Sequence, residues 1–172
     1  MPKKRKKTKS MGKICHKKTI IDGITFDSKT EAEYYLYITK NKKKLNIKEI
    51  KLQPKFLLQE KYIIRDNDIY IYNKDNDKAF KKMQKKYPGK TIQSIEYIAD
   101  FKITYTDDRV DIIDIKGIKT TDFKLKEKMF NFKYPEYGGL KCVTLYKGEW
   151  ILWDEYKKRQ KEDKKSNNAG EK

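Results

Sequence analysis

Cysteine, histidine and proline are scarce in this chain of 172 residues, which contains two cysteines, one histidine and four prolines. Cys15 and Cys142 are far apart in the sequence and form no Cys-x-x-Cys pair, and His16 has no second histidine with which to build a zinc site. The sequence also lacks an apolar run near the roughly 20 residues of a membrane span and the apolar segment of a secretory signal. These absences predict a reduced, soluble, cytoplasmic protein with no membrane association.

Acidic residues are few relative to basic ones. The chain has 43 Lys and Arg residues against 25 Asp and Glu, which gives a formal net charge of +18. An excess of this size indicates a polyanionic partner, and DNA is the partner we expect. Codon bias toward lysine would also raise the basic count, since only four of the basic residues are arginine, and part of the charge lies in the tails. Residues 1–18 hold nine Lys and Arg and no acid, which leaves about half of the excess for the rest of the chain.

The length suits one domain with a single hydrophobic core. We expect a flexible basic arm over residues 1–17, one α/β domain over 18–154 with an insertion at 66–92, and a charged C-terminal tail over 155–172. The run PKKRKK resembles a nuclear-localisation signal, but a phosphate-gripping arm explains it equally well, so we favour DNA contacts by Lys3, Lys4 and Arg5.

Hydrophobic periodicity and turn signals predict a helix, three strands, a helix and a strand as the main order, which indicates an α/β fold with a mixed sheet. The expected elements are a hairpin over 18–26, a helix over 28–40, one extended strand over 52–65, a helix over 77–87, strands over 97–105 and 110–116, a helix capped by Thr121 or Asp122 that runs to about Tyr134, and two strands around Lys147-Gly148. In the first helix, Ser28 and Glu31 have capping-box spacing, and Ala32, Tyr35, Leu36 and Thr39 follow at helical period.

The helix expected over 77–87 carries lysines around an apolar stripe. A DNA-contacting arm and a solvated surface helix both fit this pattern. The preceding DNDIYIYNKDND lacks the glycine and the closing glutamate of an EF-hand loop, so we do not expect calcium there.

The stretch VDIIDIKG places Asp114 and Lys116 among isoleucines, where an unpaired carboxylate is costly. Alternation puts Asp100 of the preceding strand on the face opposite its apolar side chains. A two-residue turn at Asp107-Asp108 would separate the two carboxylates. A three-residue loop or a bulge would put Asp100, Asp114 and Lys116 on one face, close enough for both carboxylates to bind one Mg²⁺ or Mn²⁺ ion.

Glu31 is a candidate third carboxylate, because its position borders the core-facing stripe of its helix. Its capping-box spacing also accounts for it without any functional role. An isolated Asp-x-Lys is likewise more often an ion pair than a site, so the prediction depends on the combination of helix Glu, strand Asp and Asp-x-Lys.

The ordered segments FDSKTEAEYY, LQPKF, YIADF, VDIIDIKG and FKLKEKMFNFKYP resemble a phage-encoded protein family of the PD-(D/E)XK nuclease superfamily, related to RecU-type and other phage Holliday junction resolvases. The resemblance covers roughly residues 18–146. It implies a restriction-endonuclease-like core, metal ligation by Asp100, Asp114, Glu31 and the main-chain carbonyl of Ile115, and Lys116 as the catalytic lysine. Ala99 stands where the signature has proline, and Asp114 where glutamate is more usual.

These residues predict a Mg²⁺-dependent endonuclease that hydrolyses DNA phosphodiesters, with Lys116 stabilising charge on the phosphate. Lys124, Lys126 and Lys128 follow the site and are candidates for phosphate contacts; a solvated helix face is the alternative. Branched DNA as the substrate and a homodimer come from the resemblance alone. The alternatives are a nuclease for flap, single-stranded or specific duplex DNA, and a non-catalytic nucleic-acid-binding protein in which the same residues form only an ion-pair network.

Overall fold

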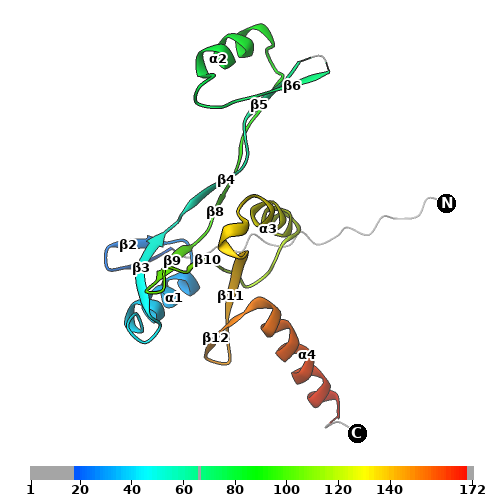
Figure 1. The fold of residues 1–172 in the computed structure, drawn as a ribbon. Helices are drawn as coiled ribbons and strands as arrows, with labels where there is room; N and C mark the ends of the chain where they lie inside the picture. Colours follow the sequence, from blue (N-terminus) through cyan, green and yellow to red (C-terminus); the bar gives the residue numbers. More distant parts are fainter. Residues whose placement is uncertain (1–17, 66, 170–172) are drawn as a thin grey trace, which may run out of the picture.

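A computed structural model describes residues 18–65 and 67–169, so the N-terminal arm expected over 1–17 lies outside the described residues. The fold is mixed α/β, and its main sheet has five strands in the order β12-β11-β10-β9-β3 (Figure 1). β10 and β11 are parallel, and the other neighbours are antiparallel. The strands are β3 (Ile47–Leu52), β9 (Phe101–Tyr105), β10 (Val110–Ile115), β11 (Leu140–Tyr146) and β12 (Glu149–Leu152).

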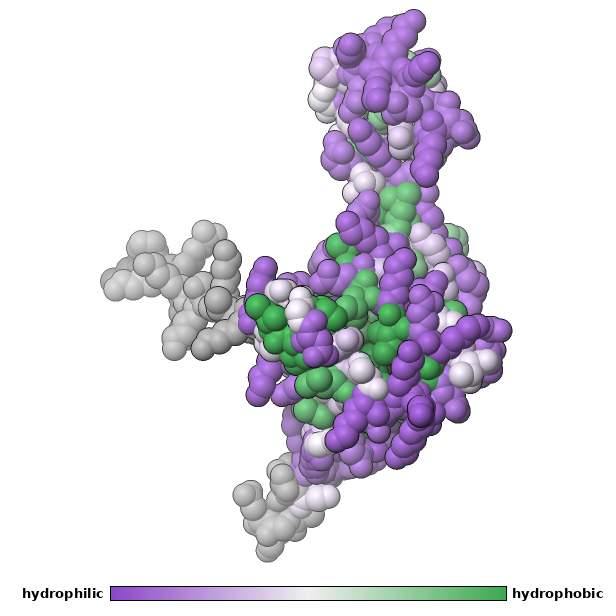
Figure 2. All heavy atoms as spheres, turned by 90° about the vertical axis from the view of Figure 1, so that its left-hand side faces the viewer, coloured by the Kyte–Doolittle hydropathy of each residue, from purple (hydrophilic) through white to green (hydrophobic). Residues whose placement is uncertain are grey.

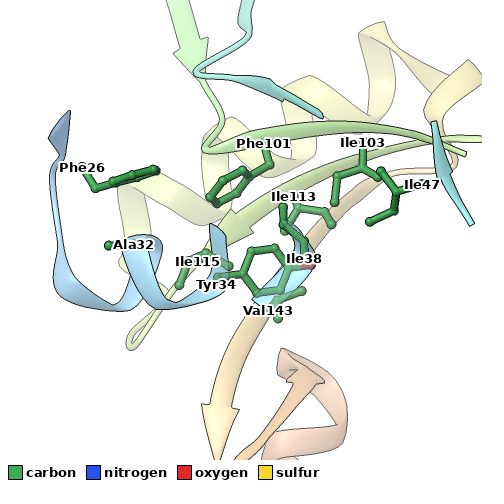
Figure 3. Packing of buried hydrophobic residues seen from close by; sticks show 10 residues of the cluster. All are labelled: Phe26, Ala32, Tyr34, Ile38, Ile47, Phe101, Ile103, Ile113, Ile115 and Val143. Atoms are coloured by element: carbon green, nitrogen blue, oxygen red, sulfur yellow. The ribbon is translucent and has the colours of Figure 1, made fainter. Parts of the chain in front are cut away.

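Helices cover both faces of this sheet. On one face, α1 (Lys29–Lys40) packs Ala32, Tyr34 and Ile38 against alternate side chains of the strands (Figure 3). On the other, α3 (Thr121–Lys133) packs Phe123 and Phe130; its cap is Thr120, which accepts from the Phe123 N–H, rather than the predicted Thr121 or Asp122. β10 serves both cores, because Ile113 and Ile115 belong to the α1 side and Ile112 to the α3 side. Burial on both faces confirms the central-strand pattern predicted for this segment.

The start of the domain largely follows the sequence prediction. β1 (Thr19–Ile21) and β2 (Ile24–Phe26) form the hairpin, and Ser28 caps α1 by accepting a hydrogen bond from the Glu31 N–H. The predicted apolar stripe of α1 is wrong in part, because Tyr34 and Ile38 are buried whereas Leu36 is 46% exposed. Tyr34 is drawn inward by edge contacts with the rings of Phe101 and Trp150, partners that helical periodicity cannot reveal.

Two predicted strands are wrong as continuous elements. The segment 52–65 divides into the end of β3, β4 (Lys55–Gln59) and β5 (Tyr62–Arg65), and 97–105 divides into β8 (Ile95–Ile98) and β9. The breaks lie side by side, since the Gln53 N–H donates to the Asp100 carbonyl and the Ala99 N–H to the Pro54 carbonyl. A single two-stranded ladder therefore bends at this point and leaves the main sheet as the pair β4–β8.

The β4–β8 ribbon carries a small unit away from the main sheet (Figure 1). This unit, which we call the tip, consists of β5, β6 (Asp68–Ile71), α2 (Asp77–Lys86) and β7 (Thr91–Ile92). Its sheet has the order β6-β5-β7, and its core contains the buried Ile63 and Phe80. The predicted insertion at 66–92 lies within the tip, which begins earlier, at β5.

The C-terminal segment, expected to be a charged tail over 155–172 outside the domain, is helical over residues 155–169. They continue α4 (Trp153–Ala169), which follows β12 directly. Buried Trp153 anchors its first turn, Arg159 pairs with Glu149 and Glu155, and Lys147 pairs with Asp163. Sequence composition marked the segment as polar but did not reveal these contacts with the β11–β12 hairpin. Within residues 18–65 and 67–169, no helix is long and apolar enough to cross a membrane.

Candidate active site

The loop between β9 and β10 sets the register on which the predicted site depends. Thr104 is opposite Val110 and Phe101 is opposite Ile113, so the connection is the three-residue loop 106–108, closed by a hydrogen bond from the Tyr105 N–H to the Arg109 carbonyl. Asp108 takes the left-handed conformation, with φ of 60°, which aspartate tolerates. The regular pairing ends at Phe101 and Ile113: the Asp100 N–H donates to the Ile113 carbonyl, and the charge of Asp114 acts on the Asp100 carboxylate, so the two carboxylates lie near each other.

Asp114 is the most deeply buried charged side chain among the described residues, with 1% of its surface exposed. Its Oδ2 lies 3.0 Å from the Nζ of Lys116. Apart from this ion pair, neither carboxylate oxygen has a hydrogen-bond partner, and the same is true of the neighbouring hydroxyl of Tyr97. Buried polar atoms without partners are costly, so they mark a place where the fold does not optimise its own stability.

Asp100 lies at the bend where the ladder leaves the main sheet. Its N–H donates to the Ile113 carbonyl, and its Oδ2 accepts the Ile115 N–H at 2.6 Å. The side chain of Asp100 thus accepts the hydrogen bond from the Ile115 N–H that a main-chain carbonyl would accept in a continuous ladder. Burial, followed by repulsion from Asp114 and Glu31, raises the pKa of Asp100 to about 8. Three carboxylates therefore share one electrostatic environment.

Glu31 reaches this environment from α1 while it also completes the helix cap. Its Oε1 accepts from the Ser28 hydroxyl at 2.9 Å, and its Oε2 accepts from the Asp27 N–H at 3.3 Å. Its charge acts on both Asp100 and Lys116. The position of Glu31 is therefore compatible both with capping and with a role in the site.

Lys116 follows β10 directly and supplies the positive charge of the cluster. Burial opposes its protonation, but the carboxylates of Asp114, Asp100 and Glu31 outweigh burial and raise the pKa of this lysine. The ammonium also lies 5.4 Å from the ring centre of Phe123, in cation–π range. Lys116 is therefore held as a cation beside the two aspartates.

The carboxylates do not converge on a single point. Within residues 18–65 and 67–169, no three Asp, Glu, His or Cys side chains form a metal-binding cluster. Asp100 is turned toward the Ile115 N–H, Glu31 toward the cap and Asp114 toward Lys116. The donor chemistry still fits a hard divalent cation, because carboxylate oxygens are its preferred ligands and both oxygens of Asp114 lack hydrogen bonds. Ile115, predicted to contribute its carbonyl, lies beside them with its side chain in the core.

A groove of about 450 Å³ opens next to Lys116, between the ribbon and the start of α3. It is lined by Glu96, Tyr97, Ile98, Lys116, Ile118, Thr120, Asp122, Phe123 and Lys126. Of the three α3 lysines predicted to contact phosphates, only Lys126 lines it. Lys124 and Lys128 are exposed, and one helical face holds both because they are four residues apart. Lys3, Lys4 and Arg5 lie outside the described residues.

Tyr97 is the site residue that the sequence pattern did not reveal. Alternation placed it on the apolar face, and it is indeed 6% exposed, but its hydroxyl lies close to the Asp114 carboxylate, in an orientation that does not form a well-aligned hydrogen bond. The sequence offered one signal: a tyrosine at a position expected to be buried usually has a hydrogen-bond partner for its hydroxyl, which indicates a polar group nearby.

Glu31 offers a test that separates capping from a role in the site. Glutamine also completes a capping box, so we expect Glu31→Gln to change the free energy of unfolding by less than about 0.5 kcal/mol, whereas Glu31→Ala should cost about 1 kcal/mol. If Glu31 serves the site, both variants lose metal-dependent cleavage to a similar extent. Urea denaturation and a cleavage assay on the same preparations measure the two effects, and full cleavage by Glu31→Gln would restrict Glu31 to the cap.

A family model described as "Protein of unknown function (DUF1064)" matches residues 11–149. The chain belongs to this family. The DUF1064 match spans α1, the main sheet through β11, the tip and α3, so the candidate active site lies wholly within it. No curated protein and no solved structure matches the chain significantly.

Proposed function

We propose that this DUF1064 protein is a divalent-metal-dependent endonuclease that hydrolyses DNA phosphodiester bonds. The observation that carries the proposal is the three-residue loop after which the Asp100 carboxylate lies near that of Asp114, with Lys116 3.0 Å from the Asp114 carboxylate. This arrangement lowers the stability of the fold, because it buries an aspartate whose only partner is the lysine and places beside it a second aspartate with a raised pKa. Perturbed groups of this kind gather at functional sites.

The order of the main elements supports a restriction-endonuclease-like core as part of the proposal. α1, β3, β9, β10, α3 and β11 follow one another with the β4–β8 ribbon and the tip between β3 and β9. The order is helix, three strands, helix and strand, as predicted, but β3 takes the place of the strand expected over 52–65. The parallel pairing of β10 with β11 after the α3 crossover gives the mixed sheet that such a core requires.

The proposed chemistry assigns one task to each residue. Asp100 and Asp114 would hold Mg²⁺ or Mn²⁺, with the Ile115 carbonyl and Glu31 completing the ligand set. The cation would supply Lewis-acid activation of water and of the scissile phosphate. Lys116, held as a cation, stabilises negative charge that develops on the phosphate oxygens. Lys126, in the adjoining groove, is placed to bind a neighbouring phosphate.

The preference for branched DNA and a homodimeric assembly remain part of the proposal on the strength of the family resemblance. Cutting two strands of a junction symmetrically requires two active sites, which a twofold dimer provides. Flap, single-stranded and specific duplex substrates stay as alternatives within the same reaction class.

The rival is a non-catalytic nucleic-acid-binding protein in which Asp114 and Lys116 are only a structural ion pair. The observed pairing at 3.0 Å fits this rival. Two observations fit it less well: Asp114 has no hydrogen bond beyond this ion pair, and Asp100 is subject to repulsion from Asp114. A structural pair is stabilising only when its remaining hydrogen-bonding capacity is satisfied.

The deciding experiment is a cleavage assay with supercoiled plasmid, linear duplex and a four-way junction, each with Mg²⁺, Mn²⁺ or EDTA. We expect cleavage only with a divalent cation and fastest on the junction. Equal rates on all substrates would contradict the preference for branched DNA but not the nuclease activity. A protein that binds all three substrates and cuts none with either metal would establish the rival.

A further inference from the structure

The tip carries a surface of lysines that its own fold does not explain. α2 contains five exposed lysines and a single acid, Asp77. Phe80 anchors the helix, packing against the rings of Tyr70 and Tyr72. At 100° per residue, three of the lysines lie on the side opposite Phe80. We call Lys78, Lys82 and Lys85 the lysine stripe.

The stripe costs the helix stability. Lys82 lies four residues from Lys78 and three from Lys85, and like charges at these spacings destabilise a helix by about 0.2–0.5 kcal/mol per pair. Asp77 offsets little of this, because it pairs with Lys81, outside the stripe, at 2.7 Å. None of the three stripe lysines has an ion-pair partner in the part of the chain that the structure describes. Charge repulsion of this kind is relieved by a bound polyanion.

The ribbon holds the stripe away from the candidate active site. β4 and β8 have five and four residues, so at about 3.3 Å per residue the ribbon separates the tip from the main sheet by about 15 Å. Figure 2 shows the tip as a hydrophilic body joined to the rest of the molecule by a narrow neck. A shallow hollow on the tip is lined by Lys81, Gln84, Lys85, Gly89 and Thr91. The tip is therefore a separate, accessible cationic surface.

We propose that the lysine stripe is a second DNA-binding surface, which binds backbone phosphates of the same duplex arm that enters the candidate active site. The choice of DNA rests on the proposed function. Lysine ammonium groups are point charges that bind phosphate without reading sequence, so this surface adds affinity rather than base specificity. With one rise of about 3.4 Å per base pair, a ribbon of about 15 Å places the contacts of the stripe at least about 4 base pairs from the cleaved bond, because α2 lies beyond the ribbon.

α4 supplies a matched control. It also carries exposed lysines, but they alternate with acids, and Arg159 pairs with both Glu149 and Glu155. Replacing Lys158, Lys161 and Lys164 by glutamine removes the same charge as Lys78→Gln, Lys82→Gln and Lys85→Gln. The two triple variants therefore have equal net charge and differ only in where charge is lost. A third variant, with arginine at the three stripe positions, retains the charge.

The test is fluorescence anisotropy of a 30-base-pair duplex in EDTA, where no cleavage occurs, over a series of salt concentrations. Each phosphate contact contributes about −0.9 to the slope of log K against log salt. The stripe variant, which lacks three lysines, should therefore have a slope that is shallower by about 2 to 3. The α4 variant and the arginine variant should keep the wild-type slope, and thermal melting should report intact folding for all three.

The results separate this inference from the proposed function. Equal slopes for the stripe and α4 variants, or no DNA binding by the wild type, would overturn the lysine stripe as a DNA-binding surface. A stripe-dependent slope in a protein that cuts no DNA with Mg²⁺ would support the inference and count against the nuclease. Normal Mg²⁺-dependent cleavage with a wild-type slope in the stripe variant would leave the nuclease standing and overturn the inference alone.

Discussion

Asp114→Asn should reduce Mg²⁺-dependent DNA cleavage by about 10²- to 10³-fold while leaving the protein folded. Asparagine fills the same space beside Tyr97 and Lys116 but removes the anionic oxygens that would bind the cation. Loss of metal-assisted stabilisation of the transition state raises the activation free energy by several kcal/mol, and each 1.36 kcal/mol lowers the rate by about a factor of ten. Initial rates on the preferred substrate at saturating Mg²⁺ give the comparison.

Asp111 provides the matched control on the same strand. It is buried, like Asp114, but its side chain points to the other face, where it accepts hydrogen bonds from the Tyr105 hydroxyl at 3.0 Å and from Lys141 at 2.6 Å. We expect Asp111→Asn to cost about 1–3 kcal/mol of stability, because it breaks a charged hydrogen bond, and to retain cleavage. If both variants lose cleavage in proportion to their stability, Asp114 is a structural residue and the proposed site is wrong.

Asp100→Asn should stabilise the metal-free protein at alkaline pH and abolish its stabilisation by Mg²⁺. In the folded protein the pKa of Asp100 is raised from 3.8 to about 8, so folding takes up a proton between these values. The folded state then binds more protons than the unfolded state, and stability falls as pH rises from about 4 to about 8. Asparagine removes this loss, which is on the order of a few kcal/mol, and its carbonyl oxygen still accepts the Ile115 N–H.

Magnesium should raise the stability of the wild-type protein at alkaline pH, where the ionised Asp100 lowers it. A cation bound by Asp100 and Asp114 offsets their repulsion, and ligand at 100 times its Kd stabilises by about 2.7 kcal/mol. For a domain of this size, a stabilisation of about 2.7 kcal/mol raises Tm by roughly 5–10 °C at pH 8. Differential scanning fluorimetry of both proteins, in EDTA and in Mg²⁺ at pH 5 and pH 8, measures the pH and metal effects together. A wild-type Tm that is indifferent to Mg²⁺ and Mn²⁺ at pH 8 would contradict metal binding at these residues.

Local signals in the sequence predicted much of the architecture. The Asp22-Gly23 turn, the Ser28 cap, the end of α3 before Pro135 and the Lys147-Gly148 turn each depend on residues that are close in the chain. Alternation in β10 correctly assigned Ile112 and Asp114 to one face and Ile113 and Ile115 to the other. In these cases one local conformation fits the residues much better than its competitors.

Long-range contacts decided the elements that were predicted wrongly. Residues 97–105 alternate like one strand, yet the strand ends at Ile98 because Asp100 turns its carboxylate to the Ile115 N–H and the ladder bends with Gln53 and Pro54. α4 resembles a solvated tail in sequence, but the β11–β12 hairpin beside it supplies Glu149 as a partner of Arg159 and Lys147 as a partner of Asp163.

The candidate site divides in the same way. The candidate residues could be identified from the sequence alone, because a carboxylate and a lysine among isoleucines require a partner in any fold that buries them. Whether Asp100 meets Asp114 was left open by the TDDR turn, since a change of one residue in loop length moves a side chain to the other face. The tertiary structure shows a loop of three residues, an Asp100 carboxylate near Asp114 and the Tyr97 hydroxyl beside them, because all three depend on pairing between neighbouring strands rather than on local residue preference.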